Sequence, residues 1–258
     1  MQAEYKDLQD KIVVVTGAAR GIGKSIAKAF LNQGAKTILI SKSSVDWTVE
    51  YDNNQFINIT GDIQDIDYFK TWLKNYEKDG LKIDILVNNA GIIQDSKLTE
   101  VTNNQWDEVM NTNCKATFFL TQLFASHMKT NNCGNIIFST SFAALLPSYK
   151  YGIYAASKAA TLSLAKSYAA ELAPHNIRVN SFSPGVIETN MTKKSRTNNA
   201  KKMLNTISLN RFGSSDEVAQ VVLFLASKES SYIHGANIDV SGGKFVIQNS
   251  DSIFSEGL

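Results

Sequence analysis

The sequence has little cysteine and almost no excess of charge of either sign. Its two cysteines, Cys114 and Cys133, lack the spacing of metal ligands and are too few for a disulfide framework. We therefore expect reduced thiols, a cytoplasmic location and no metal site. The net charge is only +2, from 26 basic and 24 acidic residues, so the charge balance does not indicate binding to nucleic acid.

Long apolar runs and linkers are missing as well. Residues 1–15 carry charges where a signal peptide needs an apolar stretch, and the longest apolar runs, such as 221–226, are too short to cross a bilayer. We expect no association with membranes. No stretch rich in proline, glycine and serine, no internal repeat and no low-complexity segment divides the chain, so residues 1–258 are expected to form one domain.

The chain does have a regular alternation of short β-branched runs and longer stretches of helical periodicity. The short runs are continuously apolar, as strands covered on both faces require. This alternation predicts an α/β fold with a parallel sheet, right-handed crossovers and helices on both faces. The connection 42–54 has little helical pattern, so its crossover helix is expected to be reduced or missing. Strands are expected at 11–16, 36–41, 55–59, 83–88, 135–139, 177–182 and 236–240, and helices at 22–33, 65–79, 103–130, 149–173 and 215–227.

A glycine-rich turn, TGAARGIG, follows the first predicted strand. Gly17, Gly21 and Gly23 are spaced G-x-x-x-G-x-G between this strand and the next helix. Glycines permit a tight turn and a close approach of backbone to a pyrophosphate at the positive end of the helix. The spacing differs from the G-x-G-x-x-G fingerprint, so by itself the motif fits an ordinary turn as well as a phosphate site.

Three further motifs stand downstream of this turn: NNAG at 88–91, YAASK at 154–158 and SPG at 183–185. In order and spacing, the four motifs resemble those of the short-chain dehydrogenase/reductase family, from about residue 11 to residue 243. The resemblance implies a Rossmann-type, doubly wound sheet of seven parallel strands with helices on both faces, and a nicotinamide cofactor. One departure is Ser241 before the terminal glycine pair, where the family usually has aspartate, and the last fifteen residues extend beyond the pattern.

The resemblance places the family's catalytic residues on Asn113, Ser141, Tyr154 and Lys158. Tyr154 and Lys158 are four positions apart and share one face of a helix, a spacing that chance alone could also produce. A free tyrosine has a pKa of ~10, and lowering it by ~3 units would take about 4 kcal/mol, which a nearby ammonium and a cationic nicotinamide ring could supply. Ser141 and Tyr154 would contact the substrate oxygen.

Two of these placements depend on a local choice. A thirteen-residue gap to the tyrosine selects Ser141 over the two hydroxyl residues before it, and alignment on Trp106 selects Asn113 over Asn111. By resemblance, Asn113 would hold a water molecule that passes protons to the catalytic lysine. The alternative for Asn113 is a polar residue inside a helix that bonds its own backbone.

Cofactor choice is expected to depend on the end of the second strand. Family members that prefer NAD usually have an aspartate there, whereas this chain has Ser41 followed by Lys42, with Arg20 in the glycine turn. This arrangement suits a 2′-phosphate and favours NADP(H), with NAD(H) as the alternative if both cations are only solvated. By resemblance, the other cofactor contacts are Ile22 in the turn, Asp62 and Ile63 at the adenine, Asn89, Ala90 and Gly91 at the adenosine ribose, and Pro184, Gly185, Ile187, Thr189, Tyr154 and Lys158 at the nicotinamide end.

Substrate choice is expected to lie in the polar, basic segment 188–212. This segment could be a lid that attracts an anionic small molecule, or simply a solvated helix face. The leading interpretation is a 3-oxoacyl-type carbonyl reductase, and its rival is a polyol or sugar-acid dehydrogenase. A non-catalytic cofactor-binding regulator is the third candidate, against which the intact catalytic set argues. By resemblance, the small-residue helix after Tyr154 implies a homotetramer or dimer.

Overall fold

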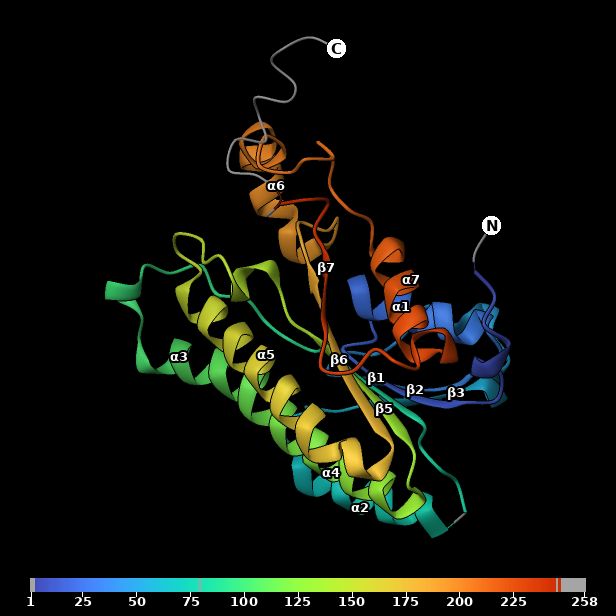
Figure 1. Cartoon of the computed structure of the whole chain (residues 1–258). Coiled ribbons are helices and arrows are strands. Elements are labelled where there is room, and N and C mark those ends of the chain that lie inside the picture. Colours follow the sequence, from blue (N-terminus) through green and yellow to red (C-terminus); the bar gives the residue numbers. More distant parts are fainter. Residues whose placement is uncertain (1–2, 79, 245, 247–258) are drawn as a thin grey trace.

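All seven predicted strands are present in one parallel sheet of order β3-β2-β1-β4-β5-β6-β7 (Figure 1). The computed structural model describes residues 3–78, 80–244 and 246, so the last fifteen residues lie almost wholly outside the described part. Each strand ends within two residues of its predicted bounds. The strands are β1 (Ile12–Thr16), β2 (Lys36–Ser41), β3 (Phe56–Thr60), β4 (Ile85–Asn88), β5 (Gly134–Ser139), β6 (Ile177–Pro184) and β7 (Asn237–Val240).

The predicted helices are present with two differences, and a further helix, α6, lies in the segment 188–212 that was expected to be a lid or a solvated helix face. A π-helical turn, η5, interrupts the long helix expected at 103–130, and the helix expected from 149 begins later because Lys150 has a φ of +69°. Only two short 3-10 turns, at 48–50 and 53–55, join β2 to β3, which confirms the reduced crossover. The elements are α1 (Gly21–Asn32), α2 (Ile66–Lys78), α3 (Asn103–Met110), η5 (Asn111–Ala116), α4 (Thr117–Asn131), α5 (Gly152–Leu172), α6 (Asn190–Leu204) and α7 (Ser215–Ala226).

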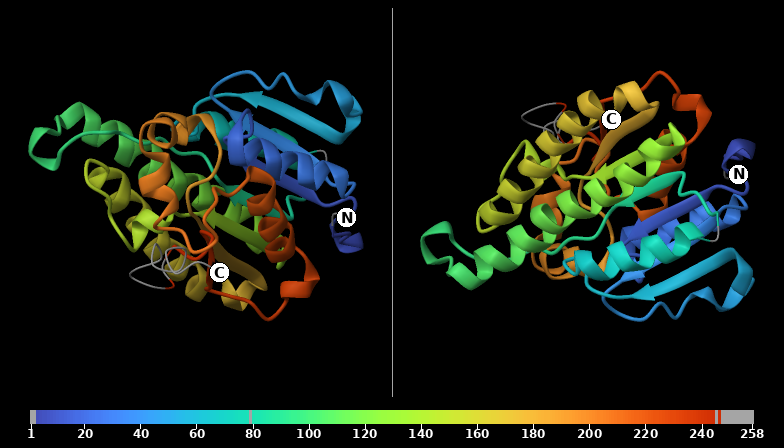
Figure 2. Two further views of the ribbon diagram at one scale, coloured as in Figure 1. Left: turned by 90° about the horizontal axis from the view of Figure 1, so that it is seen from above. Right: turned by 90° about the horizontal axis from the view of Figure 1, so that it is seen from below.

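Two hydrophobic cores cover the two faces of the sheet. Helices α1 and α7 lie on one face, and α2, α4 and α5 lie on the other (Figure 2). Val13 and Val15 pack toward α1 and α7, whereas Ile12 and Val14 pack toward the other three helices. Every residue of β1 is buried, and this double burial is the reason for its unbroken apolar sequence.

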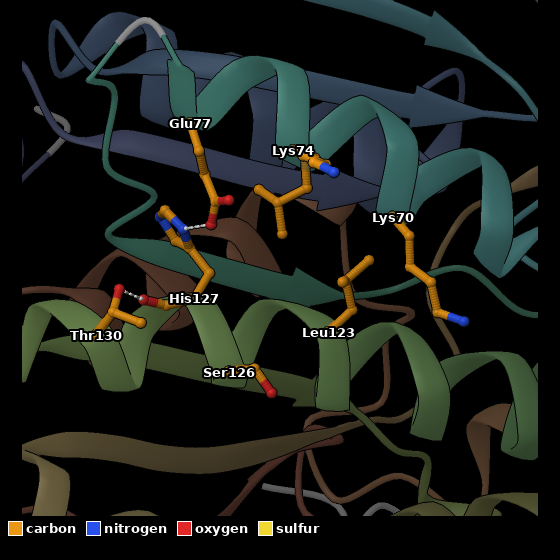
Figure 3. Close-up of a pocket in the computed structure, with 8 residues that line it drawn as sticks. Lys70, Lys74, Glu77, Leu123, Ser126, His127 and Thr130 are labelled. Carbon is orange, nitrogen blue, oxygen red and sulfur yellow. Dashed lines mark hydrogen bonds and ion pairs between the residues drawn. The ribbon is translucent and has the colours of Figure 1, made fainter.

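A buried histidine fastens the far end of the sheet to two helices. Nε2 of His127, in α4, accepts the Ile83 N–H at 3.1 Å, so the ring proton must lie on Nδ1. Nδ1 then donates to Glu77 of α2 at 2.6 Å (Figure 3). The histidine therefore joins α4, α2 and the segment that leads into β4.

This histidine borders a hollow of about 250 Å³ between α2 and α4 (Figure 3). Leu73 and Leu123 supply its apolar lining. The hydroxyls of Ser126 and Thr130 donate to carbonyls of their own helix, at 2.9 and 2.7 Å. Because these hydroxyls and the Glu77–His127 pair already have partners, the polar lining of the hollow is largely used within the two helices.

Replacing the histidine should therefore weaken the fold. We expect His127→Leu to lower the free energy of unfolding by about 1–3 kcal/mol, because the buried Ile83 N–H loses its acceptor. Urea unfolding followed by circular dichroism measures the change. His175→Leu, at a partly exposed histidine, is the control and should stay within about 0.5 kcal/mol of the parent. Equal effects of the two substitutions would contradict the fastening role.

Candidate active site

The glycine turn after β1 has the geometry of a phosphate cradle. Gly17 and Gly21 have φ angles of +70° and +55°, which L side chains rarely adopt. A Cβ on Gly23 would collide with the Gly17 carbonyl oxygen, so this position also requires glycine. Arg20 is the N-cap of α1 and makes no side-chain cap hydrogen bond, which leaves the first N–H groups of α1 for an anion. These features fit the pyrophosphate of a dinucleotide.

The carboxyl ends of β1 and β4 are tied together beside this cradle. Oγ1 of Thr16, the last residue of β1, accepts the N–H groups of Asn89 and Ala90, each at 2.9 Å. Nδ2 of Asn89 donates back to the Thr16 carbonyl at 3.0 Å. The strand order reverses between these two strands, the place where open α/β sheets bind ligands.

The predicted catalytic serine and tyrosine come together beyond the end of β5. Ser141 is the N-cap of a short 3-10 turn, and its Oγ accepts the Ala143 N–H at 3.1 Å. Its own proton is thus free for the hydrogen bond that it forms with the Tyr154 side chain. Tyr154 projects from the first turn of α5, so two distant segments supply one polar pair.

Lys158 lies one helical turn further along α5 and is buried, with 5% of its surface exposed. Its Nζ donates to the Ser139 carbonyl at 2.8 Å and lies 6.0 Å from the centroid of the Tyr154 ring. Burial lowers the pKa of Lys158 from 10.5 to about 8. Ser139 is a contact that sequence reasoning missed, because it offers a main-chain carbonyl.

In the protein alone, Lys158 does not lower the pKa of Tyr154, contrary to the expectation. Burial raises the pKa of Tyr154, and the hydrogen bond with Ser141 offsets only part of that rise. The ammonium of Lys158 is directed to the Ser139 carbonyl instead of the phenol. A raised pKa keeps the phenol protonated near neutral pH, which suits a proton donor.

Asn113 is buried in η5, but its side chain does not bond its own backbone, so that alternative is wrong. Its Oδ1 accepts the Ile92 N–H and its Nδ2 donates to the Ile92 carbonyl, both at 2.8 Å. Nδ2 also donates to Ser157 at 3.0 Å. A Cβ on Gly91 would lie 3.2 Å from Asn113 Oδ1 and 3.4 Å from Lys158 Nζ, so the NNAG loop passes closely over both residues.

The residues expected to choose the cofactor lie at the ends of β2 and β3. Lys42 forms an ion pair with Asp62 at 2.8 Å, and Ser41 before it is buried. The other Asp62 oxygen accepts the Gln64 N–H at 3.0 Å. The Lys42 side chain is 79% exposed, so donors of its ammonium remain available to a ligand. Ile63 is buried beside Asp62, and Arg20 is exposed on the glycine turn.

The residues expected at the nicotinamide end follow β6. A Cβ on Gly185 would lie 2.6 Å from the Ser241 Cα, so the close approach of β6 and β7 requires glycine there. Pro184 and Ile187 are buried in this segment. Thr189 precedes α6, and a Cβ on Gly21 would lie 3.3 Å from its methyl group. The segment after SPG thus reaches back over the glycine turn.

Helix α6 forms the centre of the predicted lid and buries none of its residues. Of its basic residues, Arg196 bonds within the segment: it pairs with Glu188 at 3.4 Å, donates to Thr192 at 3.1 Å and lies 5.6 Å from the Phe212 ring centroid. Arg196 therefore supports the shape of the lid and is not free to attract an anionic substrate. The hydroxyl of Tyr151 bonds Ser195 of α6 at 3.1 Å, which joins the lid to the start of α5.

Two other kinds of site were considered from the sequence, a membrane span and a metal centre. Within residues 3–78, 80–244 and 246, no helix is both long enough and apolar enough to cross a membrane. In that same part of the chain, no three His, Cys, Asp or Glu side chains come together as metal ligands.

Comparison with known proteins places the whole arrangement in context. The family described as Enoyl-(Acyl carrier protein) reductase matches residues 17–244. The 3-oxoacyl-(acyl-carrier-protein) reductase of Thermotoga maritima is 39% identical over 245 residues, with 92% of this chain and 98% of the relative covered. An NAD-dependent glycerol dehydrogenase of Listeria innocua is 35% identical, with 92% and 94% covered. A structure from Agrobacterium tumefaciens, described as a 2-deoxy-D-gluconate 3-dehydrogenase with bound NADP, has a TM-score of 0.86 and 32% identity, with 95% of this chain and 100% of that chain covered.

The buried lysine should make the protein less stable than its uncharged variant. The pKa of Lys158 falls from 10.5 to about 8 on folding. At 1.36 kcal/mol per unit, this corresponds to a cost of up to about 3 kcal/mol. The cost is complete below pH 8, decreases as the folded-state ammonium loses its proton between pH 8 and 10.5, and is absent above that range.

We therefore expect Lys158→Met to raise the free energy of unfolding at pH 7, and the gain to shrink by pH 10. Urea unfolding at the two pH values measures both effects. Lys166→Met, at an exposed lysine of the same helix, is the control and should change stability by less than about 0.5 kcal/mol. A Lys158→Met variant less stable than the parent at pH 7 would show that the contacts of the lysine stabilise the fold by more than its buried charge costs.

Proposed function

Because the chain belongs to the short-chain dehydrogenase/reductase family, and is thus an oxidoreductase that uses a nicotinamide cofactor, we propose that it reduces 3-oxoacyl thioesters with NADPH. The observation that carries this proposal is the joining of Ser141, Tyr154 and Lys158 at the carboxyl edge of the sheet, on the side of the glycine turn. The thioester substrate is proposed from the relative in Thermotoga maritima, whose name states that activity.

In this proposal, the chain's own residues manage the substrate oxygen and its proton. When bound, the cofactor supplies the hydride. The Ser141 hydroxyl turns from Tyr154 to donate to the carbonyl oxygen of the bound substrate, and it stabilises the charge that develops there. Tyr154 transfers its phenolic proton to that oxygen, and its raised pKa keeps the proton available near neutral pH. The Lys158 ammonium then stabilises the phenolate that remains.

The preference for NADPH rests on Lys42 and Arg20. Both cations are exposed at the end of the crevice where an adenosine would lie, and Ser41 offers no carboxylate to repel a 2′-phosphate. The related structure from Agrobacterium tumefaciens contains NADP, which supports this choice. The NAD-dependent relative from Listeria innocua is the reason to test NADH in parallel.

The second candidate function is the dehydrogenation of sugar acids or polyols. It is favoured by the likeness to a structure described as a 2-deoxy-D-gluconate 3-dehydrogenase over nearly the whole chain. The same catalytic groups would then work in the reverse direction, with Tyr154 accepting the proton. The segment 188–212, with α6 as its centre, is proposed as the lid that selects between these substrates.

Oligomeric state and location belong to the proposal as well. Helix α5 exposes a row of small residues, Ala156, Ala159, Ser163 and Ala170, on its outer face. Small residues let two helices approach closely, and Phe119 of α4 is 38% exposed. This face supports a homotetramer or a dimer, which light scattering would distinguish, and the cytoplasmic location stays a prediction.

Reductase activity can be tested with acetoacetyl-N-acetylcysteamine as a short thioester. We expect oxidation of NADPH by the parent protein and a loss of about 10²- to 10⁴-fold in Tyr154→Phe, which lacks the proton donor. Tyr232→Phe, at a fully exposed tyrosine, is the control and should retain most of the rate. A panel with gluconate, 2-deoxygluconate and glycerol decides between the two candidate functions. Turnover by Tyr154→Phe at the parent rate would instead support a non-catalytic role for this site.

Cofactor choice is tested separately at Lys42. We expect Lys42→Ala to reduce kcat/KM for NADPH relative to NADH by about tenfold, the equivalent of one charge-assisted hydrogen bond at an exposed site. Lys70→Ala, at an exposed lysine of α2, serves as the control. A parent protein that uses NADH better than NADPH would overturn the preference before any variant is made.

A further inference from the structure

The hydroxyl of Ser157 lies between two of the residues proposed to be catalytic. Ser157 has 0% of its surface exposed and precedes Lys158 on α5. Its Oγ donates to the Tyr154 carbonyl at 2.7 Å and accepts Nδ2 of Asn113 at 3.0 Å. An amide nitrogen can only donate, so the serine proton must go to the Tyr154 carbonyl. The direction of both hydrogen bonds is thereby determined.

The amide of Asn113 has no donor left for another partner. Nδ2 carries two protons, and they go to Ile92 at 2.8 Å and to Ser157 at 3.0 Å. Oδ1 accepts the Ile92 N–H at 2.8 Å, and the residue is 1% exposed. The side chain of Asn113 therefore acts as a clasp between the loop that ends at Ile92 and helix α5.

This clasp determines how the NNAG loop lies on the catalytic lysine. The point where a Cβ of Gly91 would stand is 3.2 Å from Asn113 Oδ1 and 3.4 Å from Lys158 Nζ. A small displacement of Asn113 would therefore move the loop against the ammonium or away from it. Ser157 is the group on α5 that holds Asn113 in register with Lys158 and Tyr154.

A second hydroxyl, one turn along α5, supports the same contact. Oγ1 of Thr161 lies 3.2 Å from the Asn113 carbonyl and 2.9 Å from the Ser157 carbonyl, and it donates toward both. Thr161 is also buried, with 1% of its surface exposed. Helix α5 thus contacts η5 through two hydroxyls that lie one turn apart. Ser157 bonds the side chain of Asn113, and Thr161 bonds its main-chain carbonyl.

We propose that Ser157 is a positioning residue for the proton-transfer group. It fixes Asn113, and through it the 89–92 loop, relative to Tyr154 and Lys158. This inference rests on the proposed reductase function for its kinetic consequence, but the clasp itself is a property of the fold. The clasp and the reductase function can therefore be tested separately.

The test compares Ser157→Ala with Ser167→Ala. Ser167 is a matched control, because its hydroxyl donates to the Ser163 carbonyl at 3.1 Å on the exposed side of the same helix. We expect Ser157→Ala to reduce kcat for the thioester about tenfold or more, as loss of one buried hydrogen-bond partner implies. The KM for NADPH should change less than about threefold, because the proposed cofactor contacts Asn89 and Ala90 remain bonded to Thr16. An equal loss in the two variants would overturn the proposal.

A double-mutant cycle tests the connection to Asn113. If Ser157 acts through the asparagine, the double variant with Asn113→Ala should be no slower than Asn113→Ala alone. If the rate losses of the two single variants multiply in the double variant, Ser157 acts by another route and the proposal is overturned. If circular dichroism shows that Ser157→Ala has lost its fold, Ser157→Cys takes its place, since a thiol fills the space but is a weak donor.

Hydrogen exchange provides a measurement that needs no substrate or cofactor. We expect the Ile92 amide to exchange about tenfold faster in Ser157→Ala than in the parent or in Ser167→Ala, because its acceptor is held by the clasp. Unchanged exchange at Ile92 would overturn the positioning role even if kcat falls. Faster exchange in a protein that reduces no thioester would retain the clasp and reject only the proposed substrate.

Discussion

The site depends on the parting of β1 and β4 at the carboxyl edge of the sheet. The chain leaves these neighbouring strands toward opposite faces, and the crevice between them is the place where a parallel α/β sheet binds a ligand. Thr16 connects the two strand ends by accepting two N–H groups from the loop after β4. The glycine turn and the NNAG loop are therefore held as one rim.

Burial is the second constraint, and it shifts the pKa values of Tyr154 and Lys158, the two titratable groups proposed to be catalytic, in opposite directions. It raises the pKa of Tyr154 and lowers that of Lys158, so both neutral forms are favoured relative to water. A protein selected for stability alone would not bury an ammonium against a single carbonyl. The cost is consistent with a group kept for function, since a lysine near its pKa can respond to charge that develops on the adjacent phenol.

Particular residues show how far sequence reasoning reached at this site. The four motifs pointed to loops at one edge of the sheet, and Ser141, Tyr154 and Lys158 do come together there. For Asn113, the position was identified by resemblance, whereas its partners Ile92 and Ser157 were not, because Ile92 contributes only its main chain and Ser157 looks like any helical serine. The π-helical turn was missed because hydrophobic periodicity does not register a single inserted residue. Lys42 and Asp62 were each selected for separate cofactor contacts, and the structure shows that they bond each other.

The sequence alone determined where the seven strands lie, that they are parallel, and which glycines form the turn after β1. Apolar periodicity and left-handed backbone conformations depend on neighbouring residues and can therefore be read locally. Tertiary structure decided which polar groups satisfy one another. The Ser139 carbonyl under Lys158, the clasp of Asn113 on Ile92, and the use of Arg196 within its own segment all depend on atoms brought together by packing. For Lys158 and Asn113, burial makes these partners necessary, since a buried polar group without one costs as much as a lost hydrogen bond.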